Sequence, residues 1–480
     1  MLADDVLLEI FSHCRFRSLG RNSNTLEEDL EEDPSFPPWN WLFLVHVCRR
    51  WRQIIFASPR RLDLQILCTY ETPVKKILGY WPDFPIAIDF FSLARLRTDD
   101  EDNAIAALEH PDRVCTVRIA VTGSQLGKIV AVMQESFPVL KCLEIFSMDR
   151  DVPVLPAEFL GGSAPCTEKI TLYNIPYPTL PTLLLSARDL VSLDLRRIPQ
   201  NGYISPEIMV TSLAALPRLE RLTTHFQSST PRPDRKLPPL VTRTDIPSLI
   251  SFHFEGACEY LEDLVARIDS PKLKRIFIAC LDHHVDFQVA QLCKFIDRSV
   301  GSELTPFRRA EVSFHLDRVV FDLHCQANDP SHQRPFGTTT WTTIVSEAPD
   351  WQMSDMVQEI SHFSATHSTV VHLDLKLDLE DICQLDEANN VGWLNLLHHF
   401  PALKVLYVSR ELAGPVALAL EAITAEMVAE LLPFLDMIYL EDQPPSFVEK
   451  FVASRQLIGC PVTIVNTKTE FDQRIKSWRR

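Results

Sequence analysis

Hydrophobic residues recur with helical spacing at two places near the start of the chain. The first pattern begins at Asp4 or Asp5, where an acidic residue suits the positive end of a helix dipole. Its apolar residues occur at i, i+1, i+4, i+5 and i+8, namely Val6, Leu7, Ile10, Phe11 and Cys14. The second pattern resumes near Asn40 and places on one face Leu44, Val47, Cys48, Trp51 and Ile55. The sequence therefore predicts two amphipathic helices within residues 1–62.

An acidic segment separates these two patterns. Residues 27–33 hold six acids in seven positions, and prolines follow at 34, 37 and 38. Such a segment repels itself and buries little apolar surface. We therefore expect a mobile loop over about residues 20–38.

A short phrase then recurs along the chain, with the pattern apolar-x-x-apolar-x-apolar and usually a proline just before it. Phe137–Ile145 is one copy, and later copies follow Pro217, Pro247, Pro271, Pro401 and Pro433. The last two apolar positions point the same way from a short strand, and the proline suits a turn before it, where no ladder hydrogen bond is lost. We predict a buried repeat core of Leu140, Leu143, Ile145, Leu193, Leu195, Leu219, Leu222, Leu249, Phe252, Leu273, Ile276, Leu373, Leu375, Leu403, Leu406, Leu435 and Ile438.

Helical patterns lie between the phrases, so the predicted fold class is α/β, with strands and helices in alternation. Residues 260–268, for example, carry apolar residues at helical spacing. We expect a bridging segment over 63–110 with a helix near 103–110, an irregular array over 111–465, and a basic tail over 466–480. No clear phrase falls within about 300–365, and we expect insertions at 231–239 and 326–343.

The composition limits which partners and which cellular compartment we expect for this protein. The 480 residues are 46% hydrophobic with a net charge of −17, which disfavours nucleic acid because phosphate binding needs a basic surface. The 12 cysteines include no C-x-x-C pair, which indicates a reducing compartment and no zinc ribbon. No apolar run approaches the ~20 residues that span a bilayer. We expect a soluble protein of the cytoplasm or nucleus, with no membrane partner.

Motifs for catalysis or cofactor binding are missing from the sequence. It contains no G-x-G-x-x-G, G-x-x-x-x-G-K-[ST], H-E-x-x-H or G-x-S-x-G pattern. The acids Asp282 and Asp286 flank His283 and His284, but adjacent residues point in different directions and do not converge on one ion. We expect no metal, no cofactor and no enzymatic activity.

The two N-terminal patterns, residues 2–12 and about 41–62, together resemble the F-box, a helical docking module. The recurring phrase resembles the leucine-rich repeat consensus L-x-x-L-x-L, and its first five starts are separated by 26, 27, 23 and 29 residues. The whole layout is similar to the large F-box-like families of mushroom-forming fungi. Two features depart from the F-box pattern: Ala3 stands where proline is usual, and the acidic insert is long.

This resemblance implies a substrate receptor of an SCF-type ubiquitin ligase. The N-terminal module would dock on a Skp-type adaptor, and through it on cullin and RING subunits, while the repeats bind an unknown protein target. By resemblance, the module core and adaptor contacts comprise Leu2, Val6, Leu7, Ile10, Phe11, Val47, Cys48 and Trp51.

Two other classes of function remain open. In one, the chain is an interaction scaffold, and its N-terminal helices only cap the apolar end of the repeats. In the other, the chain is an enzyme such as a hydrolase, whose active site joins a histidine and a carboxylate to a serine or cysteine distant in sequence.

Overall fold

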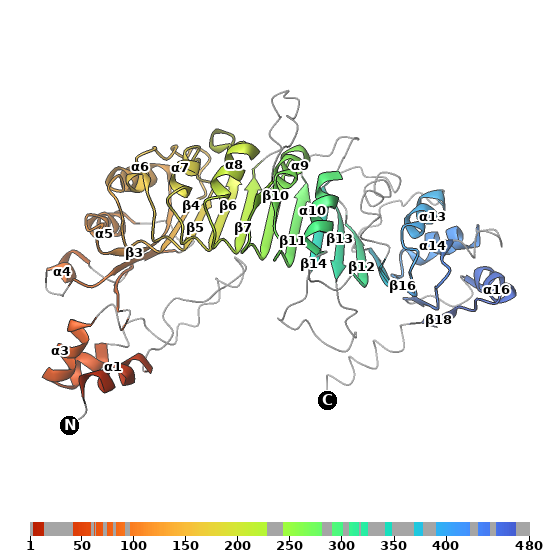
Figure 1. The fold of residues 1–480 in the computed structure, drawn as a ribbon, viewed down its shortest axis with the longest axis horizontal. Helices are drawn as coiled ribbons and strands as arrows, with labels where there is room; N and C mark the ends of the chain where they lie inside the picture. The colour runs from red at the N-terminus through yellow and green to blue at the C-terminus, as the bar shows by residue number, and fades with distance from the viewer. Residues whose placement is uncertain are drawn as a thin grey trace. The chain divides into compact units, whose positions relative to one another are not determined.

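The computed structural model divides the chain into two compact units, Met1–Leu190 and Val191–Arg480. They are called unit 1 and unit 2 below (Figure 1). The structure describes residues 3–13, 42–58, 62, 64–70, 74–79, 83–91, 97–227, 243–280, 290–300, 307–315, 318–324, 341–347, 369–377, 390–422, 431–441 and 448–466. The acidic insert, the residues around His283 and most of the basic tail lie outside these ranges.

Unit 1 begins with three helices and continues into parallel strands that pair in chain order. The helices are α1 (Asp4–His13), α2 (Leu42–Val47) and α3 (Arg49–Ala57). The strands are β1 (Ile66–Cys68), β2 (Ile86–Phe90), β3 (Val114–Val121), β4 (Cys142–Ser147) and β5 (Lys169–Tyr173). The connections contain α4 (Val74–Leu78), α5 (Thr98–Leu108), α6 (Gly123–Val132), η2 (Phe159–Gly162) and α7 (Leu180–Leu184). Figure 1 shows α5, α6 and α7 following one another along one side of these strands.

Strands β1 and β2 lie within the segment that the sequence predicts as a bridge. Ile66 and Ile86 are paired in register, and both are buried. The parallel sheet thus starts before residue 111, where we expect the array to begin.

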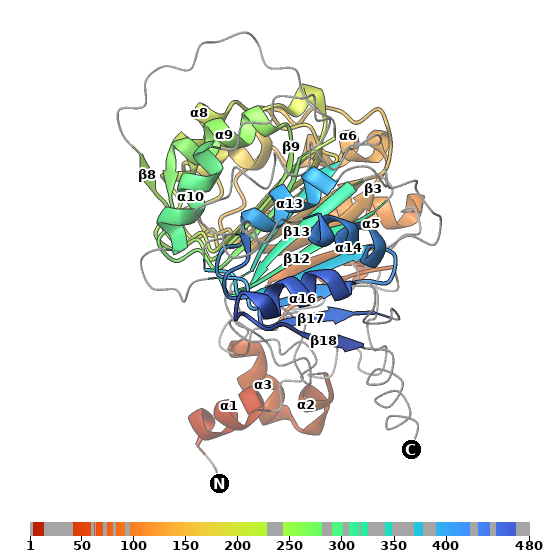
Figure 2. The ribbon, with the colours of Figure 1, turned by 90° about the vertical axis from the view of Figure 1, so that its right-hand side faces the viewer.

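Unit 2 contains the remaining strands, most of them parallel. In spatial order they are β6 (Ser192–Ile198), β7 (Arg221–Phe226), β9 (Ser251–Gly256), β11 (Arg275–Cys280), β14 (Trp341–Glu347), β13 (Arg318–His324), β12 (Arg309–Phe314), β15 (His372–Leu377), β16 (Val405–Val408), β17 (Met437–Leu440) and β18 (Thr463–Asn466). The helices are η3 (Gln200–Gly202), α8 (Pro206–Leu213), α9 (Cys258–Ala266), α10 (Ala290–Val300), α13 (Asn390–His398), α14 (Ala413–Glu421) and α16 (Glu449–Leu457). A separate short pair joins β8 (Thr244–Asp245) to β10 (Ile268–Asp269). Figure 2 shows β17 and β18 side by side, with α16 next to them.

An antiparallel insertion interrupts unit 2 where the sequence shows no phrase. Strand β13 pairs antiparallel with both β12 and β14, whereas β12 pairs parallel with β15 and β14 parallel with β11. Antiparallel neighbours need no crossover helix. The insertion therefore requires neither the proline turn nor the helical spacing that marks the other strands.

The proline before each phrase occupies the second position of a tight turn. The N–H of Leu140 donates to the carbonyl of Phe137 (3.2 Å), and Leu435 donates to Leu432 in the same way (3.3 Å). Proline fixes the backbone angle that such a turn needs at its second position. The chain then enters the strand with its next two apolar side chains directed inward.

All the predicted repeat-core positions are buried in the structure. Leu140 and Leu143 are each 1% exposed, and Leu195 and Ile276 are each 3% exposed. Between the strands, α9 buries Leu261 and Leu264 among its core residues, so helix and strand share one interior. The predicted α/β class, with a large parallel sheet and intervening helices, is confirmed.

Candidate docking surface

Helix α1 separates its apolar residues into a buried side and an exposed side. Leu7, Leu8 and Phe11 are 4%, 6% and 2% exposed, whereas Val6 and Ile10 are 45% and 41% exposed. Val6 and Ile10 are four residues apart and therefore neighbours on the helix surface. Helix α1 therefore buries apolar residues from a wider arc than a single stripe. It still has an apolar pair, Val6 and Ile10, at its surface.

The second predicted helix is in fact two helices, so the expectation of one continuous apolar face from Leu44 to Ile55 is wrong. Cys48 has extended backbone angles (φ −159°, ψ 168°), and its Sγ accepts a hydrogen bond from the Trp51 N–H at 3.5 Å. A side chain that accepts from the third residue ahead is the usual N-cap arrangement. Cys48 thus ends α2 and starts α3.

Two contacts hold α1 against α3. The rings of Phe11 and Trp51 meet edge to face, with centroids 4.8 Å apart at 63°. At the surface, Arg50 Nη2 and Asp4 Oδ1 form an ion pair at 2.6 Å. Because both charges are solvent-exposed, the ring contact contributes more than the ion pair.

Contacts also join α3 to the strand region of unit 1. Ile55 is fully buried and Leu62 is 2% exposed. The ring of Phe56 lies 5.6 Å from that of Phe84, which precedes β2. The three helices, residues 4–13 and 42–57, are called the helical module below.

The helical module keeps four of its predicted contact residues at the surface, three of them aliphatic. Val6, Ile10 and Val47 are 45%, 41% and 58% exposed, and they are called the exposed apolar set below. Cys48 is exposed as well, and Trp51 is half-buried. Leu7 and Phe11 belong to the module core, and Leu2 lies outside the described residues.

Sequence reasoning missed other core residues of the module, namely Leu8, Val45 and Ile54. Leu8 directly follows Leu7, and Ile54 directly precedes Ile55, so each lies beside a stripe residue rather than on the predicted stripe. A short helix that is covered on two sides buries a wider arc of its surface than a single stripe. Runs of adjacent apolar residues in the sequence were the signal for such a helix.

The outward face of the unit 1 strands carries charges that neutralise one another. Arg118 bridges Asp89 (3.1 Å) and Glu144 (3.2 Å), and Lys169 reaches Glu144 at 2.7 Å. Burial alone would raise the pKa of Glu144, but Arg118 and Lys169 outweigh it and hold that pKa below its usual range. The Cys142 thiol also donates to Glu144 (3.4 Å), and burial raises the pKa of that thiol. The arrangement is called the ion ladder below.

An aromatic row lies on the same strands. Phe91 contacts Phe146 edge to face at 4.5 Å, and Phe146 stacks on Tyr173 at 5.8 Å. The Arg118 guanidinium lies over the Phe91 ring, 5.3 Å from its centroid.

The outward face of unit 2 combines histidines with carboxylates. His225 Nε2 lies 2.9 Å from a carboxylate oxygen of Glu255, and the ring of His253 lies 4.2 Å from that of Phe277. Burial, reinforced by the nearby Arg196 charge, lowers the pKa of His253 to about 4. No serine or cysteine side chain of the described residues is hydrogen-bonded to this pair, so the histidine–carboxylate–nucleophile arrangement of a hydrolase is not formed there.

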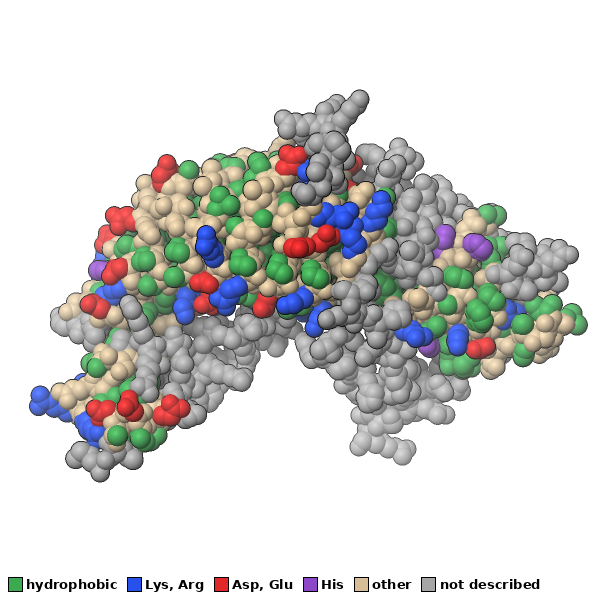
Figure 3. Space-filling view, viewed as in Figure 1, with side chains coloured by type: hydrophobic (Ala, Val, Ile, Leu, Met, Phe, Trp, Pro, Cys, Tyr) green, Lys and Arg blue, Asp and Glu red, His purple; other side chains and the backbone are tan. Residues whose placement is uncertain are grey.

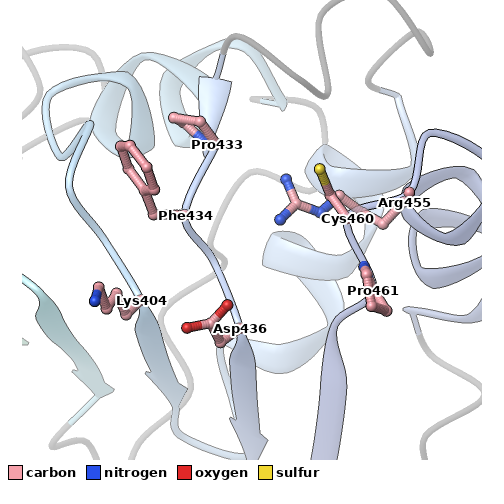
Figure 4. A pocket seen from close by; sticks show the side chains of 8 residues that line it. Lys404, Pro433, Phe434, Asp436, Arg455, Cys460 and Pro461 are labelled. Carbon is pink, nitrogen blue, oxygen red and sulfur yellow. The ribbon is translucent and has the colours of Figure 1, made fainter.

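An open pocket of about 330 Å³ lies near the end of unit 2, between the β16–β17 turns and the segment after α16. Figure 4 shows Phe434, Asp436, Arg455 and Cys460 around it. The buried Arg455 guanidinium donates to the carbonyls of Leu432 (2.7 Å) and Leu435 (2.8 Å), so it supports the turn before β17. These contacts describe a structural role rather than a catalytic one.

The part of the chain that the structure describes has no candidate metal site. No group of three or more histidine, cysteine or carboxylate side chains there could hold a metal ion. Nor is any helix there long and apolar enough to cross a membrane. The histidine pair at 283–284 lies outside that part.

Comparison with known proteins gave no relatives: neither a scan against protein-family models nor a search of curated proteins found a match.

Proposed function

We propose that this protein is the substrate-receptor subunit of an SCF-type cullin–RING ubiquitin ligase, acting in the cytoplasm or nucleus. Its helical module would dock on a Skp-type adaptor, and the strands and helices that follow would form a leucine-rich-repeat array that binds a protein target. Ubiquitin transfer would then belong to those partners.

The observation that carries this proposal is the division of the module's apolar residues. Leu7, Phe11 and Val45 already supply its core, yet Val6, Ile10 and Val47 remain exposed. Exposed apolar side chains on a small helical module are available to another protein. Burying the exposed half of one such side chain stabilises an interface by about 1 kcal/mol.

The test measures binding of a recombinant Skp-type adaptor to the full chain by co-purification and calorimetry. We expect Val6→Asp combined with Ile10→Asp to weaken binding at least tenfold, because charges would replace the apolar contact. Both positions face solvent, so the module should stay folded. The matched control is Leu457→Asp combined with Leu418→Asp, at positions of unit 2 that are 88% and 50% exposed. It adds the same charge and should bind like the unchanged chain.

The scaffold alternative is favoured by a different observation, the contacts of Phe56 with Phe84 and the burial of Ile55. A cap on the first strands would make such contacts. Under that alternative the unchanged chain would not bind the adaptor, so there would be no binding for the aspartate substitutions to weaken.

A further inference from the structure

The turns that lead into the unit 2 strands carry a surplus of positive charge. In the described segments 216–221, 246–251, 270–275, 307–309, 369–372, 400–405 and 432–437 there are eight cations and two acids. The cations are Arg218, Arg221, Lys272, Lys274, Arg275, Arg308, Arg309 and Lys404, and they are called the basic edge below. The acids are Glu220 and Asp436. This surplus stands out in a chain whose net charge is −17.

The backbone holds the basic edge in a fixed arrangement. The N–H groups of Lys274 and Arg275 both donate to the carbonyl of Ile250, and those of Ile250 and Ser251 both donate to Glu220. Arg221, Ser251 and Arg275 are aligned in register on β7, β9 and β11. Because neighbouring strands lie about 4.8 Å apart, the Cα atoms of Arg221 and Arg275 are separated by roughly 10 Å.

The cations at the start of β11 are the most available. Lys272 and Lys274 are exposed and Arg275 is half-buried. No ion pair joins these three to another described residue. Elsewhere on the edge, Arg221 lies 4.0 Å from Glu220, and Arg309 is paired with Asp374.

The corresponding turns of unit 1 are compensated. Lys141 lies 3.9 Å from Glu168, and Lys169 lies 2.7 Å from Glu144. Arg113 lies 3.4 Å from Asp83. The surplus is therefore not a general property of this turn. Figure 3 shows Lys and Arg side chains, with some Asp and Glu, at the lower border of the viewed face.

We propose that the basic edge of unit 2 binds an extended anionic peptide segment, which identifies the class of target if the protein is a substrate receptor as proposed above. Charge complementarity selects this occupant, since clustered cations attract and orient a segment with several negative side chains. The anions would be Asp and Glu side chains or phosphoserines, which share the same chemistry.

The second outward row of the strands argues against a nucleic acid as the occupant. Just inside the basic edge it carries the carboxylates of Asp194, Glu311, Asp322 and Asp374, with Glu311 in register with both Asp322 and Asp374. Asp194, Glu311 and Asp374 are paired with Arg196, Lys376 and Arg309, so this row offers no surplus of positive charge. A phosphate backbone broad enough to cover the edge would lie over this neutralised row. A single extended peptide can stay on the turns.

The test measures fluorescence anisotropy of labelled probes with the full chain. The probes are a short peptide of alternating aspartate and serine, the same peptide with phosphoserine, and a single-stranded oligonucleotide of equal charge. We expect at least one peptide to bind, more weakly as sodium chloride is raised. A Lys272→Glu, Lys274→Glu variant should lose about tenfold or more in affinity for it.

The control variant is Lys141→Glu, Arg188→Glu, which makes the same change in formal charge at exposed positions of the unit 1 turns. It should change peptide affinity less than twofold, roughly the limit expected for distant exposed charges. Equal losses in both variants, tighter binding of the oligonucleotide than of either peptide, or no peptide binding would each overturn the inference. Adaptor binding measured on the same variants should be unchanged, so failure at the basic edge is distinguishable from failure of the helical module.

Discussion

The helical module and the parallel strands use their apolar residues differently. In the strands, every predicted core position is buried, as Leu143, Leu222 and Leu406 illustrate with 1%, 1% and 0% exposure. In the module, the predicted set divides: Leu7 and Phe11 are buried, and Val6 and Ile10 are not. The predicted strand positions are therefore all buried, while the module leaves apolar residues exposed on its helices. Helices α8, α14 and α16 of unit 2 do the same at Ile208, Leu418 and Leu457.

This difference teaches that similar hydrophobic patterns carry different information in the two regions. A strand residue inside the sheet has a paired strand on each side, so inward positions are covered by the neighbouring strands. A short helix in a three-helix module is covered only where another helix reaches it. Burial is uniform in the first case and partial in the second.

The strongest way to break the comparison is a matched pair of core substitutions, Leu7→Ala and Leu143→Ala. Each removes a buried leucine and should cost about 2–5 kcal/mol, but in different regions. Leu7→Ala should unfold α1 and abolish adaptor binding with little change in the main thermal transition. Leu143→Ala should lower that transition and spare adaptor binding.

Calorimetry and adaptor co-purification on the same samples check this pair. If Leu143→Ala also abolished adaptor binding, the module and the strands would not be separable, and the comparison would fail. If Leu7→Ala lowered the main transition as much as Leu143→Ala, the module would be part of the same cooperative core.

A smaller effect is expected at the ion ladder, where Glu144→Gln removes one buried charge. Glu144 accepts from Arg118 and faces Lys169, and the loss should cost roughly 1–3 kcal/mol at neutral pH. Because the folded-state pKa of Glu144 is lowered, its contribution is full above the unfolded-state pKa and is lost as pH falls through the folded-state pKa.

Urea unfolding at a series of pH values measures this contribution. The difference between the unchanged chain and Glu144→Gln should shrink as the solution is acidified. A difference that stays constant with pH would show that packing, rather than the carboxylate charge, accounts for the cost.

The sequence predicted the strands better than the helices, for reasons that particular residues explain. A proline turn followed by two inward positions is a local signal, and it located β4, β7, β9, β11, β16 and β17. The break at Cys48 has no such signal, because neither proline nor glycine marks it and the cap is a thiol. The sequence indicated an insertion over 326–343, but strands β12, β13 and β14 were not predicted, because antiparallel pairing leaves no phrase to recognise.

The candidate site was predicted only as a set of residues. Periodicity places Val6 and Leu7 on the same stripe, and the contact of Phe11 with Trp51 in α3 shows where the neighbouring helix covers that stripe. That covering depends on the bend at Cys48, so no window confined to α1 could separate core from surface. The charges of the basic edge were likewise visible one by one, but only the register of β7, β9 and β11 brings them to one border.

The smallest expected effect is a pH-dependent loss of stability at His253 on β9, which compares the strands with the helical module. Its folded-state pKa is lowered from 6.5 to about 4, first by burial and then by Arg196. A histidine held neutral in the folded state gives full stability above its unfolded-state pKa, and stability falls between about pH 6.5 and pH 4 as the unfolded chain takes up the proton. His253→Asn should remove this part of the pH dependence, a change of about 1.4 kcal/mol near pH 5.5. Hydrogen exchange compares the two regions directly: acidification should reduce protection in β9 of the unchanged chain more than in the variant, with no such difference in α3. An equal response in α3 would mean that acid weakens the chain as a whole and that His253 has no particular share in it.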